Sequence, residues 1–297
     1  MRTLRTILLT LLASVLMLSA GRTEAAAPKG HLVIIGGGER TEEIMKRFVD
    51  LAGGAAKARI IVIPLASSTP AETGDDYVKE FHGLGVQDVV ALIPTREEAM
   101  TEATCAKLDG VTGVFFSGGD QVFITRVIVG TPLQKKLHAI YHAGAVIGGT
   151  SAGAAMMSKV MITGDELINK DTNNIFASIL RGNVQTIEGM GFLDKVIIDQ
   201  HFVKRKRLNR LVSVVLENPA LPGIGIDEST ALIVDGGTTG TVMGEGSVVI
   251  VDPRKAKDIH TVGRGNLAAR DLAMHIYAAG ESFDLTTFAR RTPRAAK

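Results

Sequence analysis

The stretch AVIGGTSAGAA, residues 145–155, decides the fold class of this chain. A β-branched run ends in small residues, a single serine follows, and a helix-forming Ala/Met segment comes next. Gly149-Thr150-Ser151-Ala152-Gly153 fits the G-x-S-x-G pattern, a sharp strand-to-helix turn that exposes a hydroxyl above a sheet. The neighbours must be small because backbone approaches backbone closely there. The pattern predicts an α/β protein with Ser151 as nucleophile and the Ala152 N–H as an oxyanion donor, or else a simple packing turn.

Short β-branched runs alternate with helical patterns over residues 31–217. This alternation predicts a mainly parallel sheet with helices on both faces, a three-layer αβα fold. From residue 224 onward, short strands between glycine turns predict a short antiparallel extension of that sheet. No repeat or interior linker divides residues 26–290, so we expect one domain, with residues 291–297 as a loose tail. The expected strands are 31–35, 59–63, 88–93, 111–116, 145–147, 196–198, 225–227, 231–234, 240–243 and 247–251, and the expected helices are 41–52, 75–83, 131–142 and 203–217.

Glycines and polar residues follow several of the predicted strands, where the functional groups of open parallel sheets collect. Gly36-Gly37-Gly38 follows the first strand, but Thr41 stands where a dinucleotide-binding fingerprint has its third glycine. We therefore expect this segment to be a loop packed close to the site. Gly119 is placed to offer a second oxyanion N–H, with a plain turn as the alternative, and Gln121 is a polar group within reach of substrate.

A serine nucleophile needs a base, and the chain has seven histidines. His201 alone sits in a polar cluster, Asp199-Gln200-His201, at the carboxyl end of a predicted strand. Its imidazole is suited to take the proton of Ser151 and return it to a leaving amine. Glu228, just after another predicted strand, is the expected orienting acid. Asp165 and Glu166 remain competing acids because they follow the helix after Ser151 closely.

Five basic residues, at positions 204–207 and 210, follow His201 directly. Such a run is often only a solvated face, but beside a catalytic His201 it stands at the rim of the site. Guanidinium groups bind carboxylates through two parallel hydrogen bonds, so an acidic substrate is expected. Nucleic acid is disfavoured because no aromatic residues are interleaved with the bases.

The first 25 residues have the order of a secretory signal peptide: Arg2 and Arg5, an apolar run, then small residues. We expect cleavage between about residues 20 and 27, after Ala25, and a secreted or periplasmic protein with no membrane span once the signal is removed. The chain has 33 basic and 31 acidic residues, and the signal carries three of the former and one of the latter. The remainder is therefore electrically balanced, which gives no general attraction to nucleic acid.

Cys105 is the only cysteine, so no disulfide can form within one chain. Its helical surroundings lack turn glycines, which favours an idle thiol over a catalytic one. The histidines lack the spacing of metal ligands, and neither a metal nor another cofactor is expected.

Three motifs together resemble the cyanophycinase family. They are residues 148–154, residues 116–121 and Asp199-Gln200-His201-Phe202, with Arg205, Arg207 and Arg210 continuing the last motif in the family's order. Residues 225–232 resemble its acid-bearing segment, and the resemblance runs from about residue 31 to residue 251. The family is related to dipeptidase E, and its fold is similar to class I glutamine amidotransferase domains. The signal peptide makes the chain similar to the exported type.

The resemblance implies hydrolysis of cyanophycin, a poly-aspartate backbone with arginine on each β-carboxyl group, to β-Asp-Arg dipeptides. It implies Ser151 as the nucleophile, His201 as the base and Glu228 as its partner, and it suggests a homodimer. The residues that would line the substrate pocket are Asp120, Gln121, Asp199, Gln200, Arg205, Arg207 and Arg210. Two alternatives stay open: an aspartyl dipeptidase of the same family, and a non-catalytic protein that binds acidic peptides.

Overall fold

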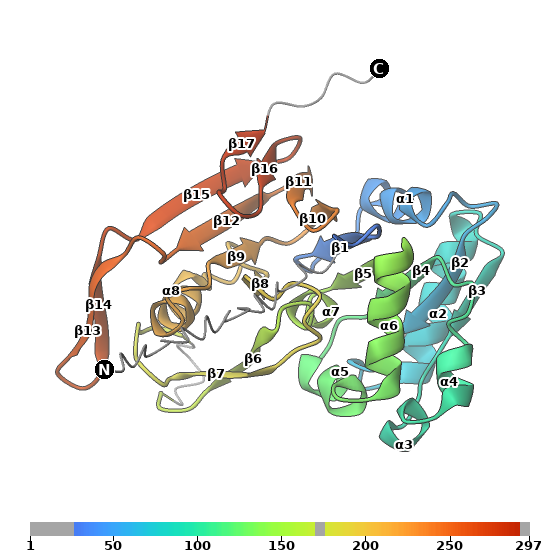
Figure 1. The fold of residues 1–297 in the computed structure, drawn as a ribbon, viewed down its shortest axis with the longest axis horizontal. Helices are drawn as coiled ribbons and strands as arrows, with labels where there is room; N and C mark the ends of the chain where they lie inside the picture. The colour runs from blue at the N-terminus through green and yellow to red at the C-terminus, as the bar shows by residue number, and fades with distance from the viewer. Residues whose placement is uncertain (1–26, 170–175, 292–297) are drawn as a thin grey trace, which may run out of the picture.

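A computed structural model describes residues 27–169 and 176–291. Its centre is a nine-stranded sheet in the order β17-β16-β11-β10-β1-β5-β4-β2-β3 (Figure 1). The five strands from β1 to β3 in that order are parallel to one another, and the pairings from β17 to β1 are antiparallel. The parallel strands are β1 (His31–Ile35), β2 (Arg59–Ile63), β3 (Asp88–Ala91), β4 (Gly113–Phe116) and β5 (Val146–Thr150), and the antiparallel ones are β10 (Thr230–Asp235), β11 (Thr239–Gly244), β16 (Ser282–Asp284) and β17 (Arg290–Arg291).

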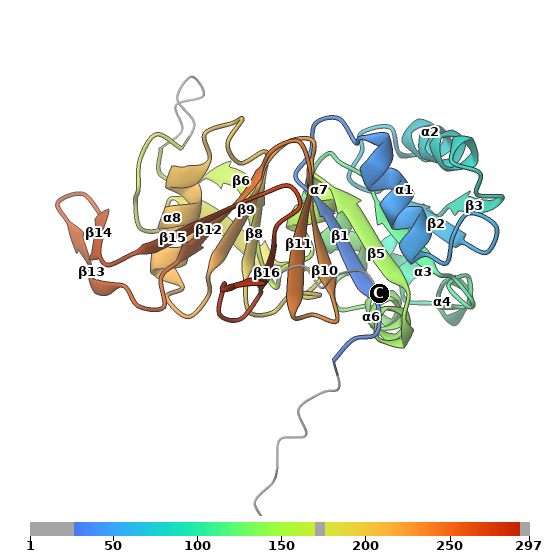
Figure 2. The same ribbon diagram turned by 90° about the horizontal axis from the view of Figure 1, so that it is seen from above.

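Helices cover both faces of the parallel strands (Figure 2). The helices α1 (Glu42–Leu51) and α2 (Pro70–Gly83) lie on one face. Ile44, Met45, Phe48 and Val49 recur at helical spacing in α1, so one stripe of that helix is buried against the sheet. The opposite face is covered by α3 (Arg96–Ala99), α4 (Glu102–Ala106), α5 (Gln121–Ile128), α6 (Pro132–Ala143) and α7 (Ala152–Ala155).

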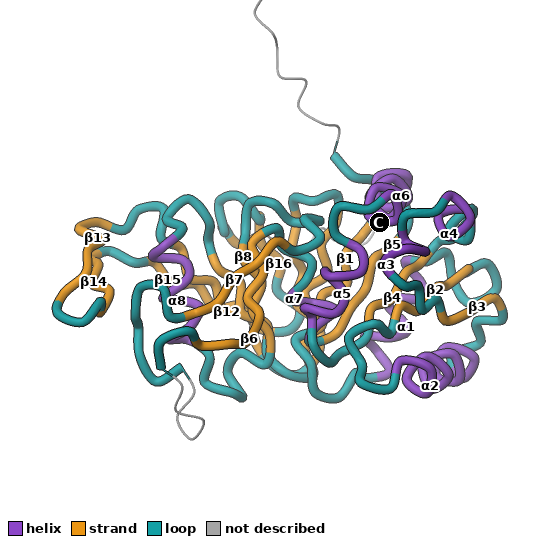
Figure 3. Tube along the Cα trace, turned by 90° about the horizontal axis from the view of Figure 1, so that it is seen from below, coloured by secondary structure: helices purple, strands orange, loops and turns teal. Residues whose placement is uncertain are grey.

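A second sheet of four strands, in the order β15-β12-β9-β8, lies beside the first (Figure 1). The helix α8 (Leu208–Glu217) packs its apolar side on this sheet. The strands of this second sheet are β8 (Ile197–Gln200), β9 (Gly223–Ile226), β12 (Ser247–Asp252) and β15 (Ala273–Ala278). Two hairpins complete the fold: β6 (Val160–Glu166) with β7 (Val184–Glu188), and β13 (Lys257–Val262) with β14 (Asn266–Arg270). The second hairpin forms the end of the molecule opposite α2 (Figure 3).

The mixed α/β class agrees with the sequence prediction, but two details of the prediction are corrected. Antiparallel pairings outnumber parallel ones among the described strands. The predicted strands 225–227 and 247–251 belong to the second sheet, not to an extension of the first. Residue alternation identifies a strand but not its partner, which is chosen by contacts between distant residues. The helix predicted from residue 203 begins only at Leu208, because His201 and Lys206 have φ of 49° and 54°, outside the helical region.

No helix in the described ranges is long and apolar enough to span a bilayer. The predicted signal peptide and residues 292–297 of the predicted tail lie outside the described residues. Cys105 is partly exposed on α4.

Candidate active site

Ser151 lies in a tight turn between β5 and α7, with φ 53° and ψ −106°. A non-glycine residue rarely adopts a positive φ, and such strain concentrates at functional sites. Glycines on both sides make the turn possible. A Cβ at Gly149 would lie 2.6 Å from the carbonyl carbon of Gly153, and a Cβ at Gly153 would lie 2.8 Å from the Cβ of Phe116. The small residues around Ser151 are therefore needed for close packing of the turn.

Three side chains from distant parts of the chain form a hydrogen-bonded row. Ser151 Oγ lies 2.8 Å from His201 Nε2, and His201 Nδ1 lies 2.6 Å from Glu228 Oε1. Ser151 follows β5 of the large sheet, His201 follows β8 of the second sheet, and Glu228 lies between β9 and β10, where the two sheets meet. A hydroxyl, an imidazole and a carboxylate at these distances can activate the hydroxyl as a nucleophile.

The competing acids lie elsewhere. Glu166, in β6, accepts hydrogen bonds from the Phe176 amide at 2.8 Å and from Asn183 Nδ2 at 2.6 Å. Asp165 is exposed on the same strand. The structure thus gives His201 one carboxylate partner among the described residues, Glu228.

Two backbone N–H groups beside Ser151 are available to an oxyanion. Ala152 is the first residue of α7, where an N–H has no partner within its own helix. Gly119 is exposed, with φ 134°, and its N–H donates to no other group in the described part of the chain. A Cβ on the preceding residue, Gly118, would lie 3.5 Å from that of Ser151, which shows how closely the two turns approach.

Four of the residues expected to contact substrate are buried, which argues against direct contact: Gln121, Asp199, Gln200 and Arg210. Gln121 is 4% exposed and donates to the carbonyl oxygens of Ile162, at 2.7 Å, and Thr163. Asp199 and Arg210 are 0% and 1% exposed and form a two-bond ion pair with each other. These bonds join Gln121 of α5 to the β6 hairpin and Arg210 of α8 to Asp199 of β8, so the side chains hold these elements together inside the protein.

The other predicted pocket residues differ in exposure. Asp120 is exposed, and its carboxylate caps α5 by accepting the Val122 amide at 2.8 Å. Arg207 is half-buried and donates to the carbonyl oxygen of Gln200 at 2.8 Å and to its side-chain oxygen, while Gln200 itself is buried. Burial lowers the pKa of Arg207 to about 10. Arg205 is exposed.

A cleft of about 460 Å³ opens directly on Ser151 and His201. Its far wall, which the sequence analysis missed, comes from Arg40 and α2. Arg40 donates to Glu80 at 2.7 Å and lies 4.5 Å from the ring centroid of Tyr77. The position of Arg40 just after the glycine run at residues 36–38 was the available signal. The full lining is Gly37, Gly38, Arg40, Ser67, Thr73, Asp76, Tyr77, Glu80, Gly118, Thr150, Ser151, His201 and Arg205.

The electrostatics of the site keep His201 neutral and Glu228 charged. Burial lowers the pKa of His201 below its usual 6.5, and the charges of Arg205 and Arg207 lower it further against the opposing effect of Glu228. The hydrogen bond from His201 lowers the pKa of Glu228, as does the guanidinium of Arg205, whose Nε lies 3.5 Å from Glu228 Oε1. A neutral imidazole beside a charged carboxylate is the state in which His201 can accept a proton.

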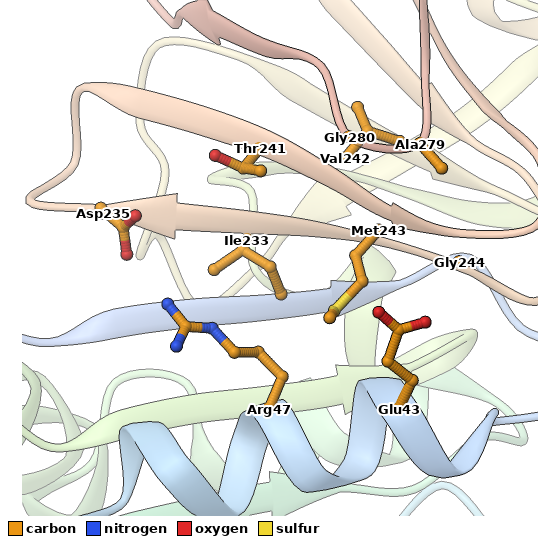
Figure 4. Close-up of a pocket in the computed structure, with 10 residues that line it drawn as sticks. All are labelled: Glu43, Arg47, Ile233, Asp235, Thr241, Val242, Met243, Gly244, Ala279 and Gly280. Atoms are coloured by element: carbon orange, nitrogen blue, oxygen red, sulfur yellow. The ribbon is translucent and has the colours of Figure 1, made fainter. Parts of the chain in front are cut away.

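A second pocket, of about 270 Å³, lies between α1 and the strands β10 and β11 (Figure 4). Glu43 and Arg47 of α1 face Ile233 and Met243 across it, and no serine, histidine or cysteine is among its lining residues. The described residues contain no group of three or more His, Cys, Asp and Glu side chains that could hold a metal ion. A third pocket, of about 420 Å³, is lined by His138, Tyr141, His142, Asp194 and Lys195 among others, but it contains no serine. Of these three pockets, the cleft at Ser151 is the one that brings a serine hydroxyl, a histidine and a carboxylate into a hydrogen-bonded row.

Residues 32–242 match the family described as Peptidase family S51. The chain belongs to this family. The match includes Ser151, His201 and Glu228, and it makes this protein a serine peptidase.

Several relatives of this S51 peptidase are named cyanophycinase. The protein from Synechococcus elongatus is 37% identical over 267 residues, 87% of this chain and 80% of its own length. That from Trichormus variabilis is 36% identical and covers 87% of both chains, and that from Geminocystis herdmanii is 33% identical over 87% and 95%. Among solved structures, a peptidase from an acI-B1 Actinobacterium matches with a TM-score of 0.65 and 23% identity, over 88% of this chain and 98% of its own, which supports the fold.

Proposed function

We propose that this S51 peptidase is a cyanophycinase, which cuts the poly-aspartate backbone of cyanophycin and releases β-Asp-Arg dipeptides through an acyl-enzyme on Ser151. The observation that carries the proposal is the row of Ser151, His201 and Glu228 at hydrogen-bond distances, opening on one cleft. The substrate is inferred from relatives named cyanophycinase at 33–37% identity over 87% of the chain.

The proposed reaction is acyl transfer in two halves. Ser151 Oγ attacks the scissile carbonyl carbon while its proton passes to His201 Nε2, and the oxyanion accepts hydrogen bonds from the N–H groups of Ala152 and Gly119. The C–N bond then breaks as His201 gives the proton to the leaving amine. Water repeats the sequence on the ester and frees Ser151. Glu228 holds the Nδ1 proton of His201 throughout and stabilises the imidazolium.

Among the arginines that the resemblance assigns to substrate, Arg205 lines the cleft. We propose that it attracts the free carboxylate of the terminal aspartyl unit, while Arg207 acts one step removed, through Gln200. Asp120 is exposed beside the Gly118–Gly119 turn. Of the two acidic residues that the resemblance assigns to substrate binding, it is the one whose carboxylate is exposed, since Asp199 is buried.

Incubation of the purified protein with insoluble cyanophycin, and separately with the dipeptide Asp-Leu, tests the substrate. We expect clearing of the polymer and β-Asp-Arg in the mass spectrum of the products, with little cleavage of Asp-Leu. Cleavage of Asp-Leu with an intact polymer would replace the proposal by an aspartyl dipeptidase activity.

The pKa of His201 gives a prediction for the pH profile. Because His201 must be neutral to accept a proton, kcat/KM is expected to fall as the pH drops through a value below 6.5. Arg205→Ala removes a positive charge that lowers this pKa, so the acid limb of the profile should move to higher pH. A profile of kcat/KM against pH for both proteins measures the shift, and Lys206→Ala, an exposed base of the same segment that does not line the cleft, is the control. A limb that stays in place or moves to lower pH would contradict this electrostatic role.

We further propose that the protein is exported by a signal peptide cleaved after Ala25, that it works as a secreted or periplasmic homodimer, and that its three-layer core is of the class I glutamine amidotransferase type. N-terminal sequencing of protein recovered outside the cytoplasm tests the cleavage, and the molar mass in solution tests the dimer.

A further inference from the structure

The glycine run at the end of β1 lies directly against the segments that carry His201 and Glu228. The amide of His201 donates to the carbonyl oxygen of Gly36 at 2.6 Å, and the amide of Ser229 donates to that of Gly37 at 2.8 Å. Gly36 in turn donates to Thr230 at 2.9 Å. The run is thus hydrogen-bonded to the backbone on both sides of the site, at the junction of the two sheets.

The imidazole of His201 rests on the bare backbone of Gly37. A Cβ at Gly37 would lie 2.8 Å from His201 Nδ1 and still closer to Cε1 and Nε2. Real Cβ atoms do not make such contacts, so any side chain at residue 37 would displace the ring. Gly38 has the same relation to the acid, since its Cβ would lie 2.8 Å from that of Glu228. Their φ values of 105° and 69° also favour glycine.

His201 needs such support. Its own φ is 49°, a conformation that a non-glycine residue rarely adopts and that persists only when the surroundings impose it. The hydrogen bond to Glu228 fixes one end of the ring, but a ring so held can still tilt about that bond. The backbone of Gly37 lies directly against the ring, beside Cε1, Nε2 and Nδ1, and so limits such a tilt on that side.

We propose that Gly36-Gly37-Gly38 is a positioning element for the base, with Gly37 as the residue that seats the His201 ring against Ser151. His201 and Glu228 fill the space in which a phosphate would approach these glycines. Close packing against the two side chains therefore accounts for the glycine run, and nucleotide binding is not needed to explain it. This inference rests on the proposed acyl-transfer role of Ser151 and His201.

The rate at which diisopropyl fluorophosphate modifies Ser151 tests whether Gly37 positions the His201 ring, and it needs no peptide substrate. In this reaction Oγ bonds to phosphorus, fluoride leaves, and the proton of Oγ passes to His201. We expect Gly37→Ala to lower the second-order rate constant by about 100-fold, as a misplacement of about 1 Å can do. Gly54→Ala is the matched control, because Gly54 also has a positive φ, 82°, but a Cβ there meets nothing within 4 Å. Its rate should equal that of the wild type.

A double-mutant cycle separates positioning from general damage. Where the ring is absent, Gly37 has nothing to position, so Gly37→Ala should cost no further rate in a His201→Ala background. The same cycle applies to thermal unfolding, even if Gly37→Ala folds poorly: His201→Ala makes room for the added methyl group, so the double variant should be more stable than Gly37→Ala alone.

Two results would overturn the inference: a Gly37→Ala rate within about twofold of the wild type, or losses that simply add in the double variant. Failure of the proposed function looks different. In that case wild-type Ser151 is not modified at all, or is modified while cyanophycin stays intact, whatever residue stands at position 37.

Discussion

Ser151→Ala should lower the kcat for cyanophycin hydrolysis by a factor on the order of 10⁶, the loss seen when a serine peptidase loses its nucleophile. The variant removes the one oxygen within hydrogen-bond distance of His201 Nε2 among the described residues. It is expected to fold normally, because alanine is small enough for the turn between β5 and α7 and the side chain of Ser151 does not cap that helix. Initial rates of dipeptide release, with far-ultraviolet circular dichroism as a folding check, measure the effect.

Ser213→Ala is the matched control. Ser213 is buried in α8, and its hydroxyl donates to the carbonyl oxygen of Asn209 at 2.9 Å, so the change removes a serine hydroxyl away from the cleft. Its kcat should equal that of the wild type. A non-catalytic protein that binds acidic peptides makes the opposite prediction for Ser151→Ala, namely no difference from the wild type in any assay.

Glu228→Gln should lower kcat by about 10⁴-fold, as replacement of the orienting acid does in serine proteases. The amide keeps the shape of the side chain but loses the charge that stabilises the imidazolium. It can also turn its NH₂ group toward Nδ1, which would favour the wrong tautomer of His201. Steady-state kinetics should therefore show a large change in kcat with KM little affected.

Glu166→Gln tests one of the two competing acids, Asp165 and Glu166, that the sequence left open beside Glu228. Glu166 contacts Phe176 and Asn183, not His201, so this variant should keep kcat close to that of the wild type. If Glu166→Gln were the inactive variant and Glu228→Gln the active one, the assignment of the acid would be reversed.

Sequence reasoning could predict those site residues that stand just after the end of a predicted strand. Ser151, His201 and Glu228 each stand just after a β-branched or apolar run, and parallel strands bring such positions to one edge. The structure places all three in one row, although they come from two sheets and not one. Local pattern predicts the strand ends, and the packing of the two sheets determines how those ends meet.

The pocket was less accessible, because exposure depends on what packs over a residue. Asp199 and Arg210 look like binding groups in sequence, yet they form a two-bond ion pair with each other inside the protein. Gln121 is bonded to the β6 hairpin in the same way. The wall formed by Arg40 and α2 was not predicted, because the local sequence does not indicate which distant residues share a cleft. Residues of α2, which follows β2, line the same cleft as Thr150 and Ser151 at the end of β5.

We propose above all that one hydroxyl, on Ser151, is activated by His201 and Glu228 to form a covalent intermediate. Peptide mapping by mass spectrometry after treatment with diisopropyl fluorophosphate tests it most directly. We predict one phosphoryl adduct per chain, located on Ser151, with hydrolysis lost in proportion to the modification. An adduct on another residue that accompanies the loss of activity, or full activity after Ser151 is modified, would contradict it.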